Sequence, residues 1–353
     1  MTSLAPTTPA RVTWPSPGQV LLLQSVRADP CVSVLASTTP APRMTDTDLR
    51  RLRRLADDAA ARLAEDDTPD ASLLTAALDE VVAGVARQAT GSAIALYVSP
   101  HLREVVRLPV PVPDRVVIDR TFATRDLVRA LHRTPQHVVL LLSEGEARLM
   151  VGVADDLRPP PRTSFPLSAE GAPLDAFLRR VDEALGTYLR LHPAPLVLVG
   201  ADRVVGRFRR QSRNTARLAG TVDANLTRAP VTTLVPRIRE VLEAYLRSRQ
   251  DEALEHLDRR RSRHAVVEGI DACWLAARRE RPEMLAVEEG FTQAARLSPD
   301  GDFLTAAGDV EHPDVVDDVV DELIETVLLR GGWIAFVDDG ALAGSGRVAL
   351  TVR

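Results

Sequence analysis

Residues 195–202 are Pro195-Leu-Val-Leu-Val-Gly-Ala-Asp202, an apolar run that ends in a glycine, an alanine and an acid. A run this short is typical of a strand that is buried on both faces of a parallel sheet. The preceding segment, Pro173–Leu191, has helical spacing, and its proline stands in the first turn, where the missing N–H is tolerated. A helix that leads into a buried strand predicts an α/β layer architecture.

The pattern continues on both sides of this strand. Val138–Leu142 and Ala147–Val153 flank Ser143-Glu-Gly-Glu146, and this spacing predicts a β-hairpin. After the strand, Val231–Leu257 contains a long helix with apolar residues on one face. We therefore expect a middle α/β domain over residues 135–257.

An N-terminal α/β domain is expected over residues 18–134, after a disordered tail at residues 1–17 that is rich in Thr, Pro and Ala. Strands are predicted at Cys31–Leu35, Ala93–Ser99 and Glu104–Leu108, because β-branched and other apolar residues concentrate there. Two helices are predicted between the first strand and the second, since leucines and valines recur at three- and four-residue spacing.

A C-terminal α/β domain is expected over residues 258–353. Ala265–Arg279 and Pro313–Leu329 have helical spacing, and three apolar runs predict strands at Met284–Val287, Trp333–Val337 and Val348–Val352. In the second helix, acids alternate with the apolar stripe: Asp317, Asp318, Asp321, Glu322 and Glu325. Charges opposite an apolar stripe are typical of a solvated helix face, so we expect these acids to face solvent.

The composition excludes several kinds of active site. The 353 residues include no lysine, so all 44 basic residues are arginine. A Walker-A phosphate loop, a pyridoxal Schiff base and a lysine general base are therefore impossible. Two cysteines, Cys31 and Cys273, cannot build a thiolate metal site, and the seven histidines are scattered singly. We expect no metal and no other cofactor.

Charge and hydropathy limit the partners and the compartment. The net charge is −5, so no global basic field attracts nucleic acid, and we expect no DNA partner. No apolar run approaches the roughly 18 residues that span a bilayer, and the N-terminus lacks the pattern of a secretory signal. The sequence thus predicts a cytoplasmic protein without a membrane partner.

One local cluster of residues is basic, although the net charge of the protein is negative. Six arginines fall within fifteen residues with no acid between them: Arg203, Arg207, Arg209, Arg210, Arg213 and Arg217. Guanidinium groups bind phosphate oxygens in bidentate fashion, so this cluster is suited to an RNA backbone. Gln211, Ser212 and Asn214 are interleaved with the arginines, and Phe208 could stack on a base. The alternative is that these arginines solvate a helix and pair with acids elsewhere in the chain.

Three stretches, in this order, resemble a known family. They are Pro30-Cys-Val-Ser-Val-Leu-Ala-Ser-Thr-Thr39 with Ala95-Leu-Tyr-Val-Ser-Pro-His101 and Arg107-Leu-Pro-Val-Pro-Val112, then Pro195–Asp202, then Ile270-Asp-Ala-Cys-Trp-Leu-Ala-Ala-Arg-Arg279 with Glu283-Met-Leu-Ala-Val-Glu-Glu289. This order resembles the bacterial members of the archaeo-eukaryotic release factor superfamily. Relatives of these proteins include the class-1 peptide release factor of eukaryotes and archaea and the ribosome-rescue protein Pelota.

The resemblance implies a fold and a place of action. It implies an N-terminal domain that reads the codon in the release factors, a ribonuclease H-like middle domain and a C-terminal domain like the kink-turn-binding ribosomal proteins. It also implies a ribosome or tRNA partner, with binding at the ribosomal A site or to RNA of similar shape.

The hydrolytic motif of that family is missing. Release factors hydrolyse peptidyl-tRNA with a Gly-Gly-Gln loop between a strand and a long helix of the middle domain. The corresponding place here is Ala154–Ala172, which contains Arg158-Pro-Pro-Pro-Arg162 and no Gly-Gly-Gln. The resemblance therefore favours a non-hydrolytic role like that of Pelota.

Two alternatives stay open, so the sequence leaves undecided whether the protein is an enzyme. One is a peptidyl-tRNA hydrolase that acts through the loop at residues 154–172. The other is a protein-interaction scaffold built on the C-terminal domain, where Trp274 and Trp333 could form a contact surface, although core packing is the more common role of such residues.

Overall fold

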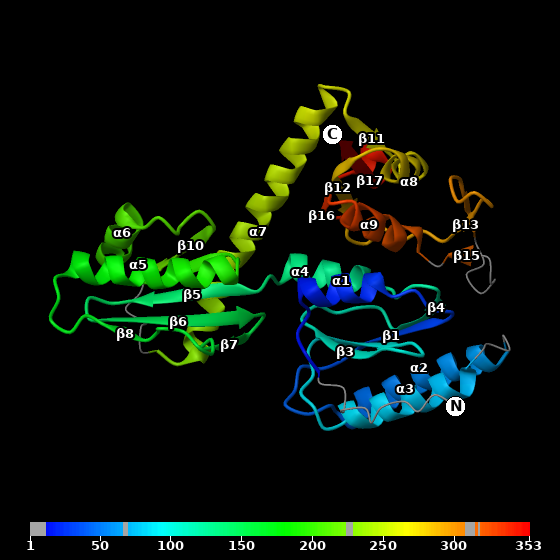
Figure 1. Cartoon of the computed structure of the whole chain (residues 1–353), viewed down its shortest axis with the longest axis horizontal. Helices are drawn as coiled ribbons and strands as arrows, with labels where there is room; N and C mark the ends of the chain where they lie inside the picture. Colours follow the sequence, from blue (N-terminus) through cyan, green and yellow to red (C-terminus); the bar gives the residue numbers. More distant parts are fainter. Residues whose placement is uncertain (1–11, 66–69, 224–228, 308–314, 317) are drawn as a thin grey trace. The chain divides into compact units, whose positions relative to one another are not determined.

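The structure is a computed structural model that describes residues 12–65, 70–223, 229–307, 315–316 and 318–353. It confirms the predicted α/β class, with helices layered on both faces of mixed and antiparallel sheets (Figure 1). The chain divides into two compact units. Unit 1 comprises residues 1–133 and 252–353, and unit 2 comprises residues 134–251.

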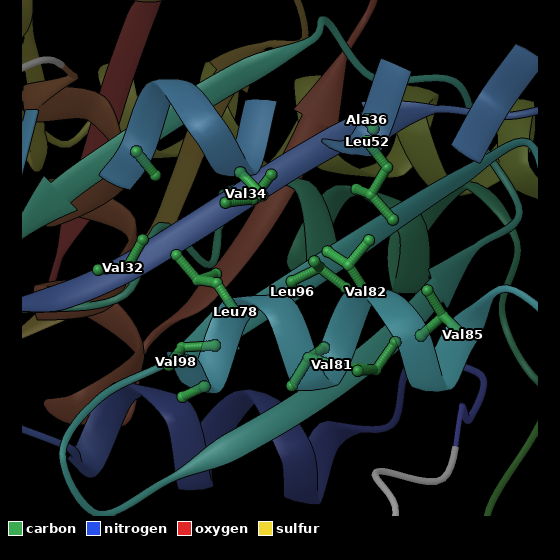
Figure 2. Close-up of a cluster of buried hydrophobic side chains, with 14 of the residues drawn as sticks. Val32, Val34, Ala36, Leu52, Leu78, Val81, Val82, Val85, Leu96 and Val98 are labelled. Carbon is green, nitrogen blue, oxygen red and sulfur yellow. The ribbon is translucent and has the colours of Figure 1, made fainter. Parts of the chain in front are cut away.

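The N-terminal sheet of unit 1 has four antiparallel strands. Their order is β3 (Arg103–Leu108), β2 (Ala93–Val98), β1 (Cys31–Ser37) and β4 (Arg115–Asp119). Helices α2 (Asp46–Glu65) and α3 (Ala71–Val85) cover one face of this sheet (Figure 2). Side chains alternate along a strand, and Val32, Val34 and Ala36 of β1 therefore point into this layer, as Figure 2 shows.

Two other helices cover the opposite face of the same sheet. They are α1 (Pro17–Ser25) and α4 (Arg125–Arg133), and they enclose Leu35 and Tyr97 together with Phe122. The Tyr97 ring meets the edge of Phe122 with ring centroids 5.4 Å apart, and the Tyr97 hydroxyl donates to the Ala123 carbonyl at 3.1 Å. Both faces of this antiparallel sheet are therefore buried.

Residues 12–17 differ from the predicted disordered tail. The Arg107 N–H donates to the Thr13 carbonyl at 3.0 Å, and the Arg107 guanidinium lies 4.0 Å from the ring centroid of Trp14. The Ser16 side chain caps α1 by accepting from the Gln19 N–H at 3.2 Å. Ordered chain thus begins before residue 17, while residues 1–11 of the predicted tail lie outside the described residues.

The C-terminal sheet of unit 1 is mixed. Its order is β11 (Val266–Glu268), β17 (Val348–Val352), β12 (Pro282–Glu288) and β16 (Trp333–Val337), with β12 and β16 parallel. Helices α8 (Ile270–Arg279) and α9 (Val319–Leu329) cover one face, and the last turns of α7 (Val231–Arg261) cover the other. A small sheet of β14 (Leu304–Ala306), β13 (Ala295–Leu297) and β15 (Val315–Val316) and a short 3-10 turn at Ala343–Ser345 complete this part.

Two helix boundaries in this part differ from the sequence prediction. The predicted helix Ala265–Arg279 begins only at Ile270, because Val266–Glu268 pairs with β17. Gly269 makes the corner with a φ of 81°, a conformation that favours glycine. The predicted helix Pro313–Leu329 begins at Val319, where Asp318 caps it, and residues 313, 314 and 317 lie outside the described residues.

Unit 2 contains a sheet with one reversed strand. Its order is β10 (Leu218–Asp223), β9 (Leu196–Gly200), β5 (His137–Leu142), β6 (Glu146–Val153) and β7 (Asp156–Arg158), and β8 (Leu167–Ser168) pairs with β6. Strands β5, β9 and β10 are parallel, and only the second of the five main strands in chain order, β6, runs the other way. Numbered along the chain, the five main strands therefore have the order 3-2-1-4-5 in the sheet.

Helices cover both faces of the unit 2 sheet. Helices α5 (Leu174–Leu191) and α6 (Asp202–Gln211) pack on one face, and the first turns of α7 pack on the other. The run at residues 196–200 is buried on both sides, as its apolar composition predicts. The three predicted domain ranges each hold a large sheet, but the boundaries at 134/135 and 257/258 stay a prediction.

The four described acids of the predicted solvated face of α9 are buried or half-buried, so this prediction is wrong for them, and Asp317 lies outside the described residues. Asp318 and Glu325 are only 8% and 4% exposed. The Arg125 guanidinium of α4 donates to Asp318 at 2.7 Å and to the Glu289 carbonyl at 2.8 Å, and Arg27 pairs with Glu325. These cations come from segments about 200 or more residues away, which is why the local pattern gave no sign of them.

Candidate nucleic-acid interface

Helix α6 begins directly after β9 and presents its arginines on the face that is turned away from the sheet. Val204, Val205 and Phe208 bury the inner face of α6 against the sheet. Phe208 is 0% exposed, so the prediction that its ring stacks on a base is wrong. Val204 and Val205 precede Phe208 by four and three residues, a spacing that places them on one helix face and that was the signal for core packing.

Two of the six predicted arginines have carboxylate partners. The Arg207 guanidinium donates through Nε and Nη2 to the two carboxylate oxygens of Asp175, each at 2.5 Å. This bidentate pair lowers the pKa of the Asp175 carboxyl and ties α6 to the first turn of α5. The Arg203 Nη2 atom lies 3.5 Å from the Glu144 Oε1 atom. Both side chains are mostly exposed, so this ion pair contributes little stability.

The other four predicted arginines are exposed, and none of them forms an ion pair with any residue that the structure describes. They are Arg209, Arg210, Arg213 and Arg217, here called the free arginine set. Arg209 and Arg210 line a surface depression together with Gly206, Thr215 and Leu218. Arg213 and Arg217 lie on the segment that joins α6 to β10. Exposed guanidinium groups without acid partners keep their donors available for anionic ligands.

A buried carboxylate holds the segment that carries Arg213. Asp182 of α5 is 9% exposed, and it accepts a hydrogen bond from the Ser212 hydroxyl and another from the Arg213 N–H at 3.1 Å. The Asn214 side chain donates to the Asp182 backbone carbonyl at 3.0 Å. Ser212 and Asn214, which the sequence suggested as polar neighbours on RNA, instead fix the local backbone.

A close approach of α5 to this segment depends on Gly186. A Cβ atom at residue 186 would lie 2.7 Å from the Asn214 side-chain amide, so a larger residue would push the segment outward. Sequence reasoning missed Asp182 and Gly186, because they precede the arginines by about thirty residues. The local signal was the pair Ser212 and Asn214, because short polar side chains of these types commonly form hydrogen bonds with nearby backbone groups.

Replacing Asp182 with alanine is expected to loosen this segment without unfolding unit 2. Two hydrogen bonds to a charged acceptor disappear, and each contributes about 1.5–3 kcal/mol. Hydrogen exchange of the amides at residues 212–217 should accelerate at least tenfold. Glu183→Ala is the matched control, since Glu183 is the exposed neighbour on the same helix. Equal exchange in the two variants would contradict the assigned role of Asp182.

The loop at residues 154–172, which the resemblance aligns with the Gly-Gly-Gln loop of release factors, carries two further predicted site residues, Arg158 and Arg162. Arg158 ends β7, Arg162 lies in the loop that leads to β8, and both side chains are exposed. Asp155 at the start of this loop pairs with Arg239 of α7 at 2.5 Å. Within the described ranges, no hydrogen bond or ion pair links Arg158 or Arg162 to α6.

Neither a metal centre nor a membrane span is found in the described parts of the chain. No three His, Cys, Asp or Glu side chains come together there in a way that could hold a metal ion. No described helix combines the length and apolarity needed to cross a bilayer. Trp274 is buried and donates to the Gly301 carbonyl at 2.8 Å, whereas Trp333 is 39% exposed.

A family comparison matches the part of the chain that contains the arginines. Residues 172–281, about a third of the chain, match the model of bacterial archaeo-eukaryotic release factor family 3. This match includes α5, α6 and the free arginine set. No curated protein matches the sequence.

Solved structures of similar proteins share little sequence with this chain. The S. cerevisiae protein Dom34, described as a translation termination-like factor involved in RNA quality control pathways and interacting with Hbs1, is 10% identical. The alignment covers 97% of this chain and 93% of Dom34, with a TM-score of 0.47. The archaeal translation termination factor aRF1 is 14% identical, with 95% and 96% covered and a TM-score of 0.26. Archaeoglobus fulgidus Pelota is 16% identical, with 74% and 78% covered and a TM-score of 0.34.

Proposed function

We propose that this chain, which resembles the bacterial archaeo-eukaryotic release factors, is a ribosome- or tRNA-associated translation factor of the cytoplasm. In this proposal, unit 2 contacts RNA phosphates through the free arginine set. The observation that supports it is the presence of four exposed arginines that have no carboxylate partner among the described residues, together with a buried acid that holds the backbone at Arg213.

A structural role explains only part of the free arginine set. Arg209 and Arg210 lie in the last turn of α6, where positive charge is favourable beside the negative end of the helix dipole. Arg213 and Arg217 lie beyond that helix, so the dipole gives no reason for their charge. In an acidic protein, a local group of exposed guanidiniums supports the proposal of an RNA-binding surface at this place.

Co-sedimentation with bacterial ribosomes tests this function. Four phosphate contacts would release about four counterions, so affinity should fall about 100-fold between about 50 and 200 mM salt. Bovine serum albumin, which is also acidic, serves as the control for trapping in the pellet. Failure of this chain to sediment with ribosomes, or to bind deacylated tRNA, at the lower salt concentration would contradict the proposal.

The hydrolase alternative acts on the same ribosomal substrate and needs its own assay. Purified protein is mixed with ribosomes that hold peptidyl-tRNA, and released peptide is measured over time. We expect binding without release, because the loop at residues 154–172 lacks Gly-Gly-Gln. Ester hydrolysis above the ribosome-only rate that disappears in an Arg158→Ala/Arg162→Ala variant would favour the enzyme instead.

A further inference from the structure

The N-terminal and C-terminal parts of unit 1 meet at a surface crowded with ionisable groups. The N-terminal turn of α9 faces β4 and the segment that leads from β4 to α4 around a cavity of about 30 Å³, which is large enough for a water molecule. The cavity lining includes Arg115 and Asp119 of β4 and Asp318, Asp321 and Glu322 at the start of α9. Three acids of one short segment therefore line the same small cavity.

Two of these carboxyl groups form no ion pair with any residue that the structure describes. The Asp321 Oδ1 atom is inaccessible to solvent and has no hydrogen-bond partner among the described residues. Glu322 accepts from the neutral Thr121 hydroxyl at 2.8 Å. The nearest guanidinium of α4, that of Arg125, is instead directed to Asp318 and to the Glu289 carbonyl.

Other ionisable groups surround Asp321 and Glu322 on each element that packs against the start of α9. Asp318 and Glu325 are on α9 itself, Arg115 and Asp119 on β4, Arg125 and Asp126 on α4, Tyr97 on β2, and Arg27 follows α1. Arg115 donates to Asp126 at 2.9 Å, and Arg27 pairs with Glu325, so both of these cations are already engaged. An additional negative charge on Asp321 or Glu322 would therefore be poorly compensated.

We propose that the contact between the two parts of unit 1 is proton-coupled: Asp321 and Glu322 are neutral while α9 packs on β4 and α4, and they ionise when these surfaces separate. The packed arrangement is here called the closed state, and the separated one the open state. The proposal is independent of ribosome binding, because every group in it lies within unit 1.

The direction of the pH dependence follows from the ionisation of the two acids. Burial raises the pKa of Glu322 to about 6 and that of Asp321 well above its ordinary value. A carboxyl whose pKa is raised in the closed state binds its proton more tightly there, so acid favours closure. Closure then weakens as the pH rises through about 6. Glu322 alone should increase the ratio of open to closed molecules about tenfold between pH 5 and pH 8, and Asp321 should add to this.

Spin labels on the full chain can measure this equilibrium. Arg54 of α2 and Arg263 after α7 are exposed, so cysteines introduced at these two positions can carry the labels. The native Cys31 and Cys273 are buried, so the label should react only with the introduced cysteines. Electron–electron distance measurements at pH 5 should give one short population. At pH 8, a longer population should grow by at least tenfold relative to the short one.

Isosteric neutral variants separate protonation from a general effect of pH. Asp321→Asn/Glu322→Gln should keep the short population at both pH values, and the single variant Glu322→Gln should reduce the response if the double variant folds poorly. Glu280→Gln is the control, because Glu280 is an exposed acid at the end of α8, and it should respond like the parent chain. An unchanged distance distribution in the parent chain, or an equal pH response in Glu322→Gln and Glu280→Gln, would overturn the proposal.

Discussion

Replacing Arg125 with alanine is expected to lower the free energy of unfolding of unit 1 by about 3–5 kcal/mol. The Arg125 side chain is 4% exposed, and it bonds to the buried Asp318 carboxylate and to the Glu289 carbonyl. Alanine would leave a buried carboxylate without its cation and a carbonyl without a donor, and unpaired buried charge is costly. Urea unfolding followed by hydrogen exchange of unit 1 amides measures the loss.

The control for Arg125 is an arginine of the same segment at the surface. The Arg120 side chain is 81% exposed and lies 3.7 Å from Asp29, so Arg120→Ala should cost less than about 1 kcal/mol. Unit 2 amides should be protected equally in both variants, since neither arginine belongs to that unit. If Arg125→Ala and Arg120→Ala unfold at the same urea concentration, the buried pair does not stabilise unit 1.

The variant Arg209→Ala/Arg210→Ala/Arg213→Ala is expected to bind ribosomes or tRNA at least about 100-fold more weakly than the parent chain. Each charge-assisted contact with a phosphate contributes about 1.5–3 kcal/mol. Losing three contacts should also make the slope of log affinity against log salt shallower by about three. Filter binding or sedimentation across a salt series measures both quantities. Arg207 is left intact because its pair with Asp175 ties α6 to α5.

A matched variant tests whether position or total charge decides this effect. Arg179→Ala/Arg180→Ala/Arg237→Ala removes the same charge from exposed sites of unit 2 outside residues 203–217. It should keep most of the affinity and most of the salt slope. If the two triple variants bind equally, RNA recognition lies elsewhere and the free arginine set is only a solvated surface.

Sequence alone predicted the elements whose pattern is strong and local. The apolar run at residues 196–200, the hairpin around residues 143–146 and the helices over 46–65 and 71–85 are confirmed, because each is encoded within its own segment. The strand Val266–Glu268 was missed, since three residues before a helix carry no clear period and Gly269 alone marks the corner.

The sequence found the arginines but not their environment. Asp175 and Asp182 lie within the helix before β9, so no spacing rule connects them to Arg207 or Arg213. The acids of α9 illustrate the same limit. Their periodicity fits a solvated helix, and only the packed structure brings Arg27 and Arg125 to them.

The discontinuity of unit 1 has a consequence for its synthesis. Asp318 is 193 residues downstream of Arg125, so a ribosome that adds about 5–20 residues per second needs about 10–40 s to produce the partner. During that interval the exposed side of α4 has no counterpart, whereas the uninterrupted stretch 134–251 can already fold. Arg125 of α4 therefore lacks its carboxylate partner in the growing chain, and nascent-chain stalling before residue 318 should leave α4 more sensitive to protease than in the complete chain.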